Sequence, residues 1–150
     1  MRVVIQRVRS ASVIIQDKVF GEINCGIVVF VGFELHDNED DVKWMVNKII
    51  NMRIFNDINN KMNLSLLDID GEILLISQFT LYSSTRKGNR PSFSSAAKPA
   101  YAKKYYEITI NEIQKKINNK IQKGKFGSMM DVSLINDGPV TITMDSKNKE

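Results

Sequence analysis

Residues 26–32 constrain the fold of this 150-residue chain most strongly, because their sequence, Gly-Ile-Val-Val-Phe-Val-Gly, is apolar on both faces of a strand. Such a strand has to be covered on both sides, so we predict that it is central and buried. Other strand-like runs surround it along the chain. They cover residues 3–8, 11–16, 18–23, 72–81, 130–135 and 140–144.

Two helices are predicted from apolar stripes at helical spacing. The first follows Asp37, which we expect to cap it, with Asp40 completing an acidic first turn. The second is expected to open at Pro99 and to stop at Gly124. The stripe of the first helix is Val42, Met45, Val46, Ile49 and Ile50. The stripe of the second is Ala102, Tyr106, Ile110, Ile113, Ile117 and Ile121.

Strands and helices in this mixed order predict an α+β fold with a β-barrel-like, curved mixed sheet and two main helices. No repeat or linker divides the chain, so residues 1–150 are predicted to form a single domain. No run approaches the roughly 18 apolar residues of a membrane span, and residues 1–10 are too short and too charged for a signal peptide. We therefore expect a cytoplasmic protein without a membrane partner.

The chain has one cysteine and one histidine, which limits its chemistry more than any motif does. A lone cysteine excludes a disulfide framework and a cysteine-based zinc site, and we expect Cys25 to be buried and inert. His36 stands in a polar stretch and is expected in a surface loop. Neither a protein-only histidine triad nor a multi-histidine metal site is easy to build from this set.

Residues 77–80, Ser-Gln-Phe-Thr, are the most reactive-looking stretch. Strand alternation would place Ser77 and Phe79 on one face and Gln78 and Thr80 on the other. Hydroxyls and an amide at a strand end can position a carbonyl or donate hydrogen bonds to a developing oxyanion. A hydroxyl nucleophile needs a base, however, and no His, Lys or Asp is adjacent. Plain tolerance of Ser and Thr where a strand ends is the alternative.

Two loops combine cations with an aromatic ring, in a chain of net charge +4. Residues 85–93 carry Arg86, Lys87 and Arg90 and suit phosphate and ribose contacts, although a solvated charged loop explains them nearly as well. Residues 124–127 place Phe126 between glycines, where it can stack on a base or fill the core. Lysines also cluster near the end of the second helix, where the helix dipole favours them.

Gly138 and Pro139 stand between two strand-like runs. The pair combines a residue of free φ with one of fixed φ and no N–H, and X-Pro is the common place for a cis peptide. Bare backbone groups held at a set angle can recognise a small ligand by its shape. Asn136 and Asp137 before the pair are ordinary turn residues, so these four residues alone favour a turn over a recognition element.

Taken together, six segments resemble the D-aminoacyl-tRNA deacylases. They occur in the order of that family and cover nearly the whole chain. The segments are residues 2–7, 53–55, 61–64, 77–81, 88–93 and 136–141. The tail beyond Met144 and the lysine-rich second helix look individual to this chain.

The resemblance implies a homodimer with the active site at the subunit interface and with no metal or cofactor. The Ser-Gln-Phe-Thr motif of the family lines the pocket, and its Gly-cis-Pro motif is offered by the other subunit. That backbone element excludes L-aminoacyl groups and admits D-amino acids and glycine. The assignments that follow are catalytic roles for Thr80 and Ser77, substrate binding for Gln78, Phe79, Gly138, Pro139, Phe126 and Met130, and tRNA binding for Arg86, Lys87 and Arg90.

The implied substrate is aminoacyl-tRNA, whose ester is hydrolysed to free tRNA and a D-amino acid in chiral proofreading of translation. Glycyl-tRNA mischarged on tRNA(Ala) is a further expected substrate. The catalytic push would come from the terminal ribose 2′-hydroxyl, although a nucleophilic Thr80 stays open. Two other readings stay open as well: a non-catalytic tRNA-binding barrel, and a Thr- or Ser-nucleophile hydrolase of small esters.

Overall fold

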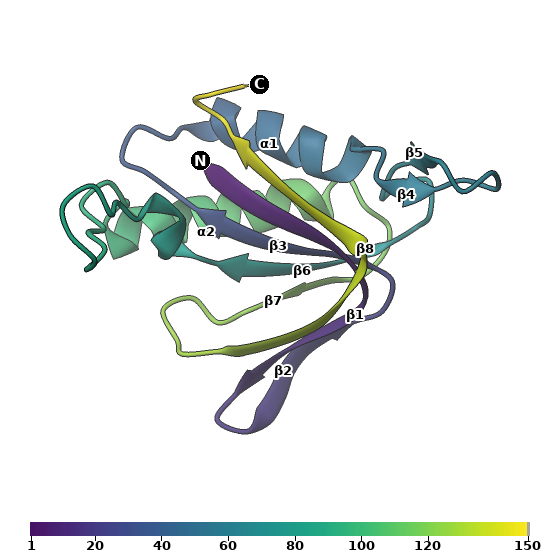
Figure 1. The fold of residues 1–150 in the computed structure, drawn as a ribbon, viewed down its shortest axis with the longest axis horizontal. Coiled ribbons are helices and arrows are strands. Elements are labelled where there is room, and N and C mark those ends of the chain that lie inside the picture. The colour runs from purple at the N-terminus through teal and green to yellow at the C-terminus, as the bar shows by residue number, and fades with distance from the viewer. Residues whose placement is uncertain (150) are drawn as a thin grey trace.

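The computed structural model describes residues 1–149 as a strongly curved sheet packed against two α-helices (Figure 1). The strands are β1 (Arg2–Ile15), β2 (Lys18–Ile23), β3 (Gly26–Gly32), β4 (Phe55–Asn56), β5 (Met62–Leu64), β6 (Glu72–Ser77), β7 (Ile121–Lys123) and β8 (Asp131–Asp145). The helices are α1 (Glu39–Asn51) and α2 (Pro99–Gln114), and a 3₁₀ helix, η1, spans Phe79–Tyr82. The predicted α+β class is confirmed.

The main sheet has the order β2-β1-β3-β6-β7, with β8 paired to β1. β1 is antiparallel to all three of its partners: it pairs with β3 over residues 2–8 and with β2 over residues 11–15, and β8 follows it along both parts. β6 is parallel to β3 and β7. β2 curls back to β7, where a β-carbon on Gly21 would lie 3.1 Å from Gln122 Oε1. The mixed sheet is therefore nearly closed, as predicted.

The prediction of a central, buried strand at residues 26–32 is confirmed. β3 lies between β1 and β6, and alternate residues serve two cores because successive side chains of a strand point to opposite faces. Ile27, Val29 and Val31 join the core beneath the helices, whereas Val28 joins a second core inside the curved sheet. All four side chains are fully buried, and each such burial stabilises the fold by about 1.5–3 kcal/mol.

The first helix begins one residue later than predicted. Asn38 caps α1, and its Oδ1 accepts hydrogen bonds from the N–H groups of Asp40 and Asp41 at 2.9 and 3.0 Å. The Asp41 carboxylate accepts from the Asn38 N–H, which completes a capping box. Asp37 is instead buried and ion-paired with the α-amino group of Met1.

The second helix ends ten residues before Gly124, so that boundary was predicted wrongly. Its apolar stripe continues in sequence through Ile121, but Ile121 belongs to β7, which pairs with β6. Between the two elements the Asn119 side-chain amide donates to the Asp70 carbonyl across the fold, which fixes the chain outside the helix.

Cys25 is exposed, contrary to the prediction, because it lies in the turn before β3 rather than in the strand. His36 is exposed in a loop, as predicted. The runs at 3–8 and 11–16 form one long strand, β1, and those at 130–135 and 140–144 form one long strand, β8.

Candidate active site

Three strands of the main sheet end at one edge, and two loops leave the sheet there. β3 ends at Gly32, β6 at Ser77 and β7 at Lys123. Because β6 is parallel to both β3 and β7, these three ends lie at the same edge. The chain continues into residues 78–98 after β6 and into residues 124–130 after β7. We call this the carboxyl edge. Every predicted site residue except the Gly138-Pro139 pair lies at the carboxyl edge or in the two loops that leave it.

The chain turns sharply after Ser77. The Gln78 N–H donates to the Val31 carbonyl at 2.7 Å. Gly32 makes this approach possible, because a β-carbon there would lie 2.7 Å from the Gln78 carbonyl oxygen. The prediction that the strand continues to Leu81 is therefore wrong, and the expected alternation of side chains gives way to η1 after Gln78.

The Thr80 hydroxyl accepts a hydrogen bond from Gln78 Nε2. A hydroxyl has one proton to donate, and within residues 1–149 the Thr80 proton has no acceptor. Ser77 and Thr80 are half-buried, and neither hydroxyl is bonded to a His, Lys or Asp side chain. This arrangement presents a directed donor in a partly desolvated place, which suits polarising a carbonyl better than nucleophilic attack.

The loop that follows η1 is closed by contacts at its base. Ser84 and Ser92 exchange backbone hydrogen bonds of 2.8 and 2.9 Å. Phe79 and Phe93 pack edge to face with ring centroids 5.0 Å apart, yet Phe79 is 57% exposed. The exposed cations that this loop carries are Arg86, Lys87 and Arg90. In the described part of the chain none of them is in an ion pair.

Phe126 and Met130 both leave from the carboxyl edge but pack on different cores. The half-buried Phe126 ring lies 5.8 Å from the Tyr106 ring and contacts the core beneath the helices. Met130 contacts the core inside the sheet and covers Gly124, where a β-carbon would lie 2.5 Å from its Sδ. The Tyr106 hydroxyl donates to the Leu75 carbonyl at 2.7 Å, and burial raises its pKa. Stacking of Phe126 on a base stays a prediction.

The Gly138-Pro139 peptide is cis and lies inside β8, so the hairpin-turn interpretation is wrong. Gln6 pairs with Thr141 and Val8 with Asn136, so a single residue of β1 is opposed by four residues of β8. The extra backbone forms a bulge over residues 137–140. Gly138 and Pro139 are both exposed on it.

The bulge is anchored by Arg7, a buried arginine. Its Nε donates to the Asp137 carbonyl at 2.9 Å, and its Nη1 donates to the Ile54 carbonyl. The guanidinium also lies 3.2 Å from the Asp137 carboxylate. Gly138 has φ +137°, and a β-carbon there would lie 3.0 Å from the Val140 nitrogen and 3.1 Å from Arg7 Nη2. Only glycine fits this position without displacing its neighbours.

The predicted site does not include Arg7, although the sequence contains a signal for it. Val3, Ile5 and Arg7 share one face of β1, and a cation stands where the pattern requires an apolar side chain. A buried charge needs partners, so an anchoring role can be expected at such a position. Asn136 has a similar role: its Oδ1 accepts from the Val140 N–H at 2.8 Å, which closes the bulge.

Within one chain the bulge and residues 77–80 lie far apart. Arg7, opposite the bulge, pairs with Ile27 of β3, which is level with Ile73 at the amino end of β6. Ser77 lies four residues further along β6, about 13 Å away at about 3.3 Å per residue. Two strands, β1 and β3, also separate β8 from β6. The carboxyl edge therefore has no Gly138-Pro139 element from its own chain.

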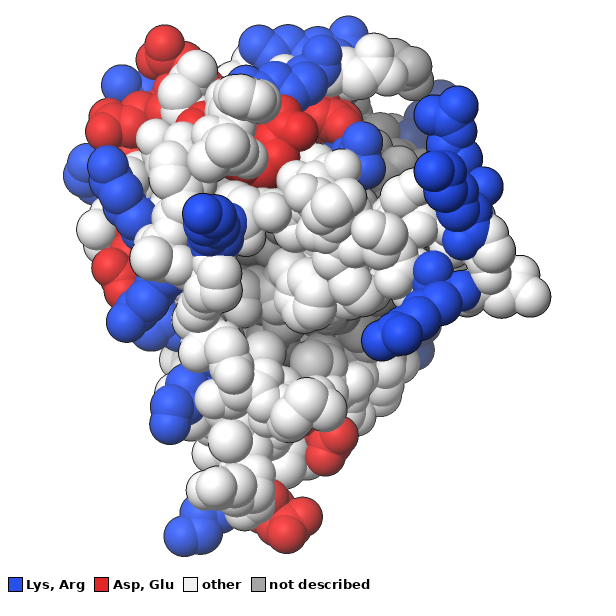
Figure 2. Space-filling view, turned by 90° about the vertical axis from the view of Figure 1, so that its left-hand side faces the viewer, with Lys and Arg blue, Asp and Glu red and all other residues white. Residues whose placement is uncertain are grey.

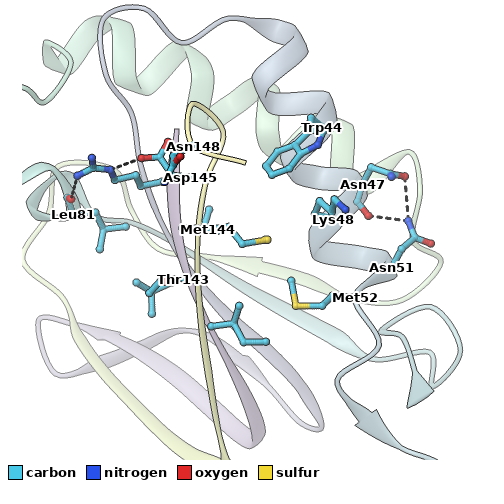
Figure 3. A pocket seen from close by; sticks show the side chains of 14 residues that line it. Trp44, Asn47, Lys48, Asn51, Met52, Leu81, Thr143, Met144, Asp145 and Asn148 are labelled. Atoms are coloured by element: carbon cyan, nitrogen blue, oxygen red, sulfur yellow. Dashed lines mark hydrogen bonds and ion pairs between the residues drawn. The ribbon is translucent and has the colours of Figure 1, made fainter. Parts of the chain in front are cut away.

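A cavity of about 740 Å³ opens between α1 and the last residues of β8 (Figure 3). Trp44 of α1 and Met144 of β8 line opposite sides of it. Its lining extends to Leu81 of η1, whose carbonyl accepts a hydrogen bond from Arg2 Nη1 at 3.2 Å. Arg2 Nε also donates to Asp145 at 2.8 Å. The cavity contains no predicted site residue, but it borders η1.

Among residues 1–149, no three His, Cys, Asp or Glu side chains are grouped so that they can hold a metal ion. No helix in that range is long and apolar enough to cross a membrane.

Comparisons with known proteins identify the family and the fold of the chain. A family model described as D-Tyr-tRNA(Tyr) deacylase matches residues 4–145. The D-aminoacyl-tRNA deacylase of Flavobacterium psychrophilum is 53% identical over 150 residues and is covered in full, as is this chain. That of Thermosipho africanus is 54% identical over 147 residues, 98% of each chain.

Two solved structures share the fold. A protein described as c-Myc DNA unwinding element binding protein is 39% identical, with a TM-score of 0.92 over 97% of this chain and 98% of that one. A probable eukaryotic D-amino acid tRNA deacylase superposes with a TM-score of 0.84 at 16% identity, over 95% of this chain and 97% of that one, which is a likeness of fold.

Proposed function

Because the chain belongs to the D-Tyr-tRNA(Tyr) deacylase family and hydrolyses the ester bond of D-aminoacyl-tRNA, we propose that its active site is completed by a second copy of the chain. Residues 77–80 of one protomer line the pocket, and the Gly138-Pro139 element enters it from the partner. The observation that carries this proposal is the separation of the two motifs within one chain. An isologous dimer joins them twice, once in each pocket.

The bulge has the properties that such an inserted element needs. Gly138 and Pro139 are exposed, while Arg7 holds the backbone before them from the buried side. The outer edge of β8 has no strand partner in the described part of the chain, so a second copy can approach it. A rigid, exposed segment loses little conformational entropy when it docks.

Selection of the D-amino acid follows from recognition by backbone. The substituents on the α-carbon of the substrate differ in size, and an L side chain would project toward the partner's Gly138-Pro139 carbonyl groups. A hydrogen atom in the same place is tolerated, so D-amino acids and glycine fit. The element carries no side chain at Gly138, which makes its reading of shape independent of side-chain rotamers.

Thr80 and Ser77 act on the ester by position and polarisation. The free proton of the Thr80 hydroxyl donates to the ester carbonyl and to the oxyanion that replaces it. Neither hydroxyl has a base beside it, so the attack is assigned to water assisted by the terminal ribose 2′-hydroxyl. Gln78 orients Thr80 through its amide, and Phe79 forms a wall of the pocket. No cofactor enters this scheme.

Three further points complete the proposal. Phe126 and Met130 border the substrate, and the exposed cations Arg86, Lys87 and Arg90 contact the tRNA backbone. Glycyl-tRNA mischarged on tRNA(Ala) is a second substrate, because glycine has no side chain to be excluded. The single domain of residues 1–150 works in the cytoplasm, where aminoacyl-tRNA is made and used.

A non-catalytic nucleic-acid-binding barrel is the second candidate. The exposed cations of the 85–93 loop favour it, and one relative of the same fold is described as a DNA-element binding protein. Hydrolysis of matched D- and L-tyrosyl-tRNA separates the two candidates. Deacylation of the D form only is expected, and equal loss of both esters, or of neither, would refute the deacylase. A tRNA ending in 2′-deoxyadenosine tests the ribose: an unchanged rate would refute only the 2′-hydroxyl mechanism.

The shared site is tested by mixing two impaired variants, Thr80→Val and Gly138→Ala. A mixed dimer contains one pocket with both defects and one pocket with none. Equal mixing followed by subunit exchange is therefore expected to restore about a quarter of wild-type turnover. If each chain formed its own complete site, no pocket in the mixture would be intact and no activity would return.

A further inference from the structure

The charges of the chain are divided unevenly along its sequence. Residues 73–130 carry 11 of the 21 Lys and Arg residues but only two of the 17 Asp and Glu residues. This stretch forms β6, the loop with Arg86, Lys87 and Arg90, the helix α2, and β7. The rest of the chain carries a net negative charge. The basic character of the protein is therefore a property of one part of its surface.

Most lysines of this stretch lie at one or the other end of α2, while Lys123 and Lys125 lie at the carboxyl edge, at and after the end of β7. The helix begins at the carboxyl edge, where the Ala97 N–H donates to the Phe33 carbonyl at 2.9 Å. Lys98 and Lys103 are exposed at that end, directly after the basic loop. Lys116 and Lys120 are exposed beyond the other end, and the Lys120 carbonyl accepts from the amino end of β6 at 3.1 Å.

The other helix gives the same edge a negative side. α1 also begins there, and its first turn is acidic, with Glu39, Asp40 and Asp41. Figure 2 looks onto this edge and shows acidic side chains gathered mainly in the upper part of the view, with Lys and Arg along the two sides of a broad uncharged area. Lys43 lies 4.0 Å from Asp40 and Lys147 lies 2.6 Å from Asp41, which compensates part of this negative charge, so a polyanion that approaches the site is attracted more strongly to the α2 side than to the α1 side.

We propose that the double-stranded acceptor arm of the tRNA lies along a basic lane formed by the 85–93 loop and by Lys98 and Lys103 of α2. This inference rests on the proposed function, which brings the aminoacylated 3′ end to residues 77–80. The stem has to leave the site over a neighbouring surface, and the α1 side is acidic. In the described part of the chain Lys98 and Lys103 belong to no ion pair, so their charges are available to phosphates.

The test compares two charge reversals of equal size. Lys98→Glu/Lys103→Glu changes the near end of α2, and Lys116→Glu/Lys120→Glu changes the far end. Each is assayed with D-tyrosyl-tRNA and with a D-tyrosyl ester of the trinucleotide CCA, which has no stem. For the near variant, the ratio of kcat/KM on the tRNA to kcat/KM on the trinucleotide is expected to fall about 10–100-fold. The slope of log(kcat/KM) for the tRNA against the logarithm of the salt concentration should become shallower by about one to two.

The far variant is the control and should keep the wild-type ratio between the two substrates. Equal losses in both variants, or an unchanged ratio in the near one, would overturn the lane. Binding of uncharged tRNA to the same proteins gives this comparison without turnover. A wild-type protein that binds tRNA through Lys98 and Lys103 but cleaves neither ester would leave the lane standing and refute the proposed function instead.

Discussion

Two of the three arginines of β1, Arg2 and Arg7, each anchor one half of the proposed site, and they do so in different ways. Arg2 is half-exposed and reaches η1 through the Leu81 carbonyl and β8 through Asp145. Arg7 is buried and holds the bulge by donating from Nε to the Asp137 carbonyl, while its Nη1 donates to the Ile54 carbonyl and to Asn56 Oδ1. One anchor is a solvated surface contact, and the other is part of the core.

The difference follows from what each half presents to the substrate. In the proposed mechanism residues 77–80 act through a hydroxyl proton, which can rotate to meet its acceptor, so small shifts of the backbone are tolerated. The bulge acts through carbonyl groups fixed in the chain, so their direction depends wholly on what holds the backbone. A backbone recognition element therefore needs a rigid anchor, and a buried, multiply bonded guanidinium provides one.

The largest effect is expected for Arg7→Ala. The change leaves the Ile54 and Asp137 carbonyls without their donors in a buried place, and the free energy of unfolding should fall by about 2–4 kcal/mol in urea titrations. The kcat/KM for D-tyrosyl-tRNA should fall about 100-fold or more, because the displaced bulge no longer fits the partner's pocket. Arg7→Lys should recover little of the lost stability and activity, since an ammonium group cannot reproduce the hydrogen bonds that the planar guanidinium donates in fixed directions.

Arg9→Ala is the matched control for that prediction. Arg9 binds the same residue, Asp137, at 3.3 Å, but its side chain is 75% exposed. Its removal should change stability by about 0.5 kcal/mol or less and leave chiral selection intact. Similar losses for both arginines would mean that the charge of Asp137, rather than the buried anchor, fixes the bulge.

Gly138→Ala should have the next largest effect, and its loss should be greater in activity than in stability. The added methyl group meets the Val140 nitrogen and Arg7 Nη2, so the carbonyl groups around it have to turn. D-tyrosyl-tRNA turnover is expected to fall about 10–100-fold. Gly88→Ala is the control: Gly88 also has a positive φ, +73°, but nothing lies within 4 Å of an added β-carbon. Comparable turnover in both variants would contradict a role for the Gly138 contacts.

Thr80→Val should lower kcat for D-tyrosyl-tRNA about 10–100-fold, because it removes the donor for the oxyanion and keeps the shape. Thr80→Ser restores the proton and should recover most of the rate. The unfolding free energy should change by less than about 1 kcal/mol in both variants, since the residue is only half-buried. A Val variant that turns over normally would remove Thr80 from the chemistry and leave the bulge as the main determinant.

The sequence predicts the elements of this molecule better than their ends. The apolar run in β3 is continuous and the stripe of α1 is strongly periodic, so both were recognised. The end of α2 was not, because Ile117 and Ile121 continue the helical spacing although Ile121 belongs to β7. Only long-range contacts distinguish the two states, namely the pairing of β7 with β6 and the bond from Asn119 to the Asp70 carbonyl, and the local pattern contains no information about them.

The same holds for the candidate site: the sequence indicates which residues matter but not where the fold places them. Residues 77–80 were singled out from their chemistry alone, but η1 was missed because it depends on the bond from Gln78 to Val31 and on the absence of a side chain at Gly32. Gly138-Pro139 was noted for its backbone, yet its place inside a strand follows from the pairing of β8 with β1. Arg7 was overlooked because its partners are carbonyl groups distant in sequence.

The smallest effect is expected for substitutions of Arg2 and Asp145, which form the exposed anchor. The pH dependence of their effect on stability distinguishes this anchor from the buried Arg7. Burial tends to raise the pKa of Asp145, but hydrogen bonds from Arg2 and from the Lys147 N–H outweigh this, so the pKa lies below its ordinary value. A carboxylate with a lowered pKa stabilises the fold above about pH 4 and loses that contribution as the pH falls through the lowered pKa.

Arg2→Ala and Asp145→Asn should therefore each lower the free energy of unfolding at pH 7 by no more than about 1 kcal/mol, with turnover within about twofold of wild type. The difference from wild type should shrink in 1 M salt because the pair is partly solvated, and it should shrink as the pH falls below about 4, toward the lowered pKa of Asp145. The deficit of Arg7→Ala should persist under both conditions, since buried carbonyl groups stay unsatisfied whatever the charge of nearby carboxylates. Urea titrations at pH 3 and 7, with and without salt, measure both variants together, and parallel behaviour of the two arginines would show that they anchor their segments in the same way.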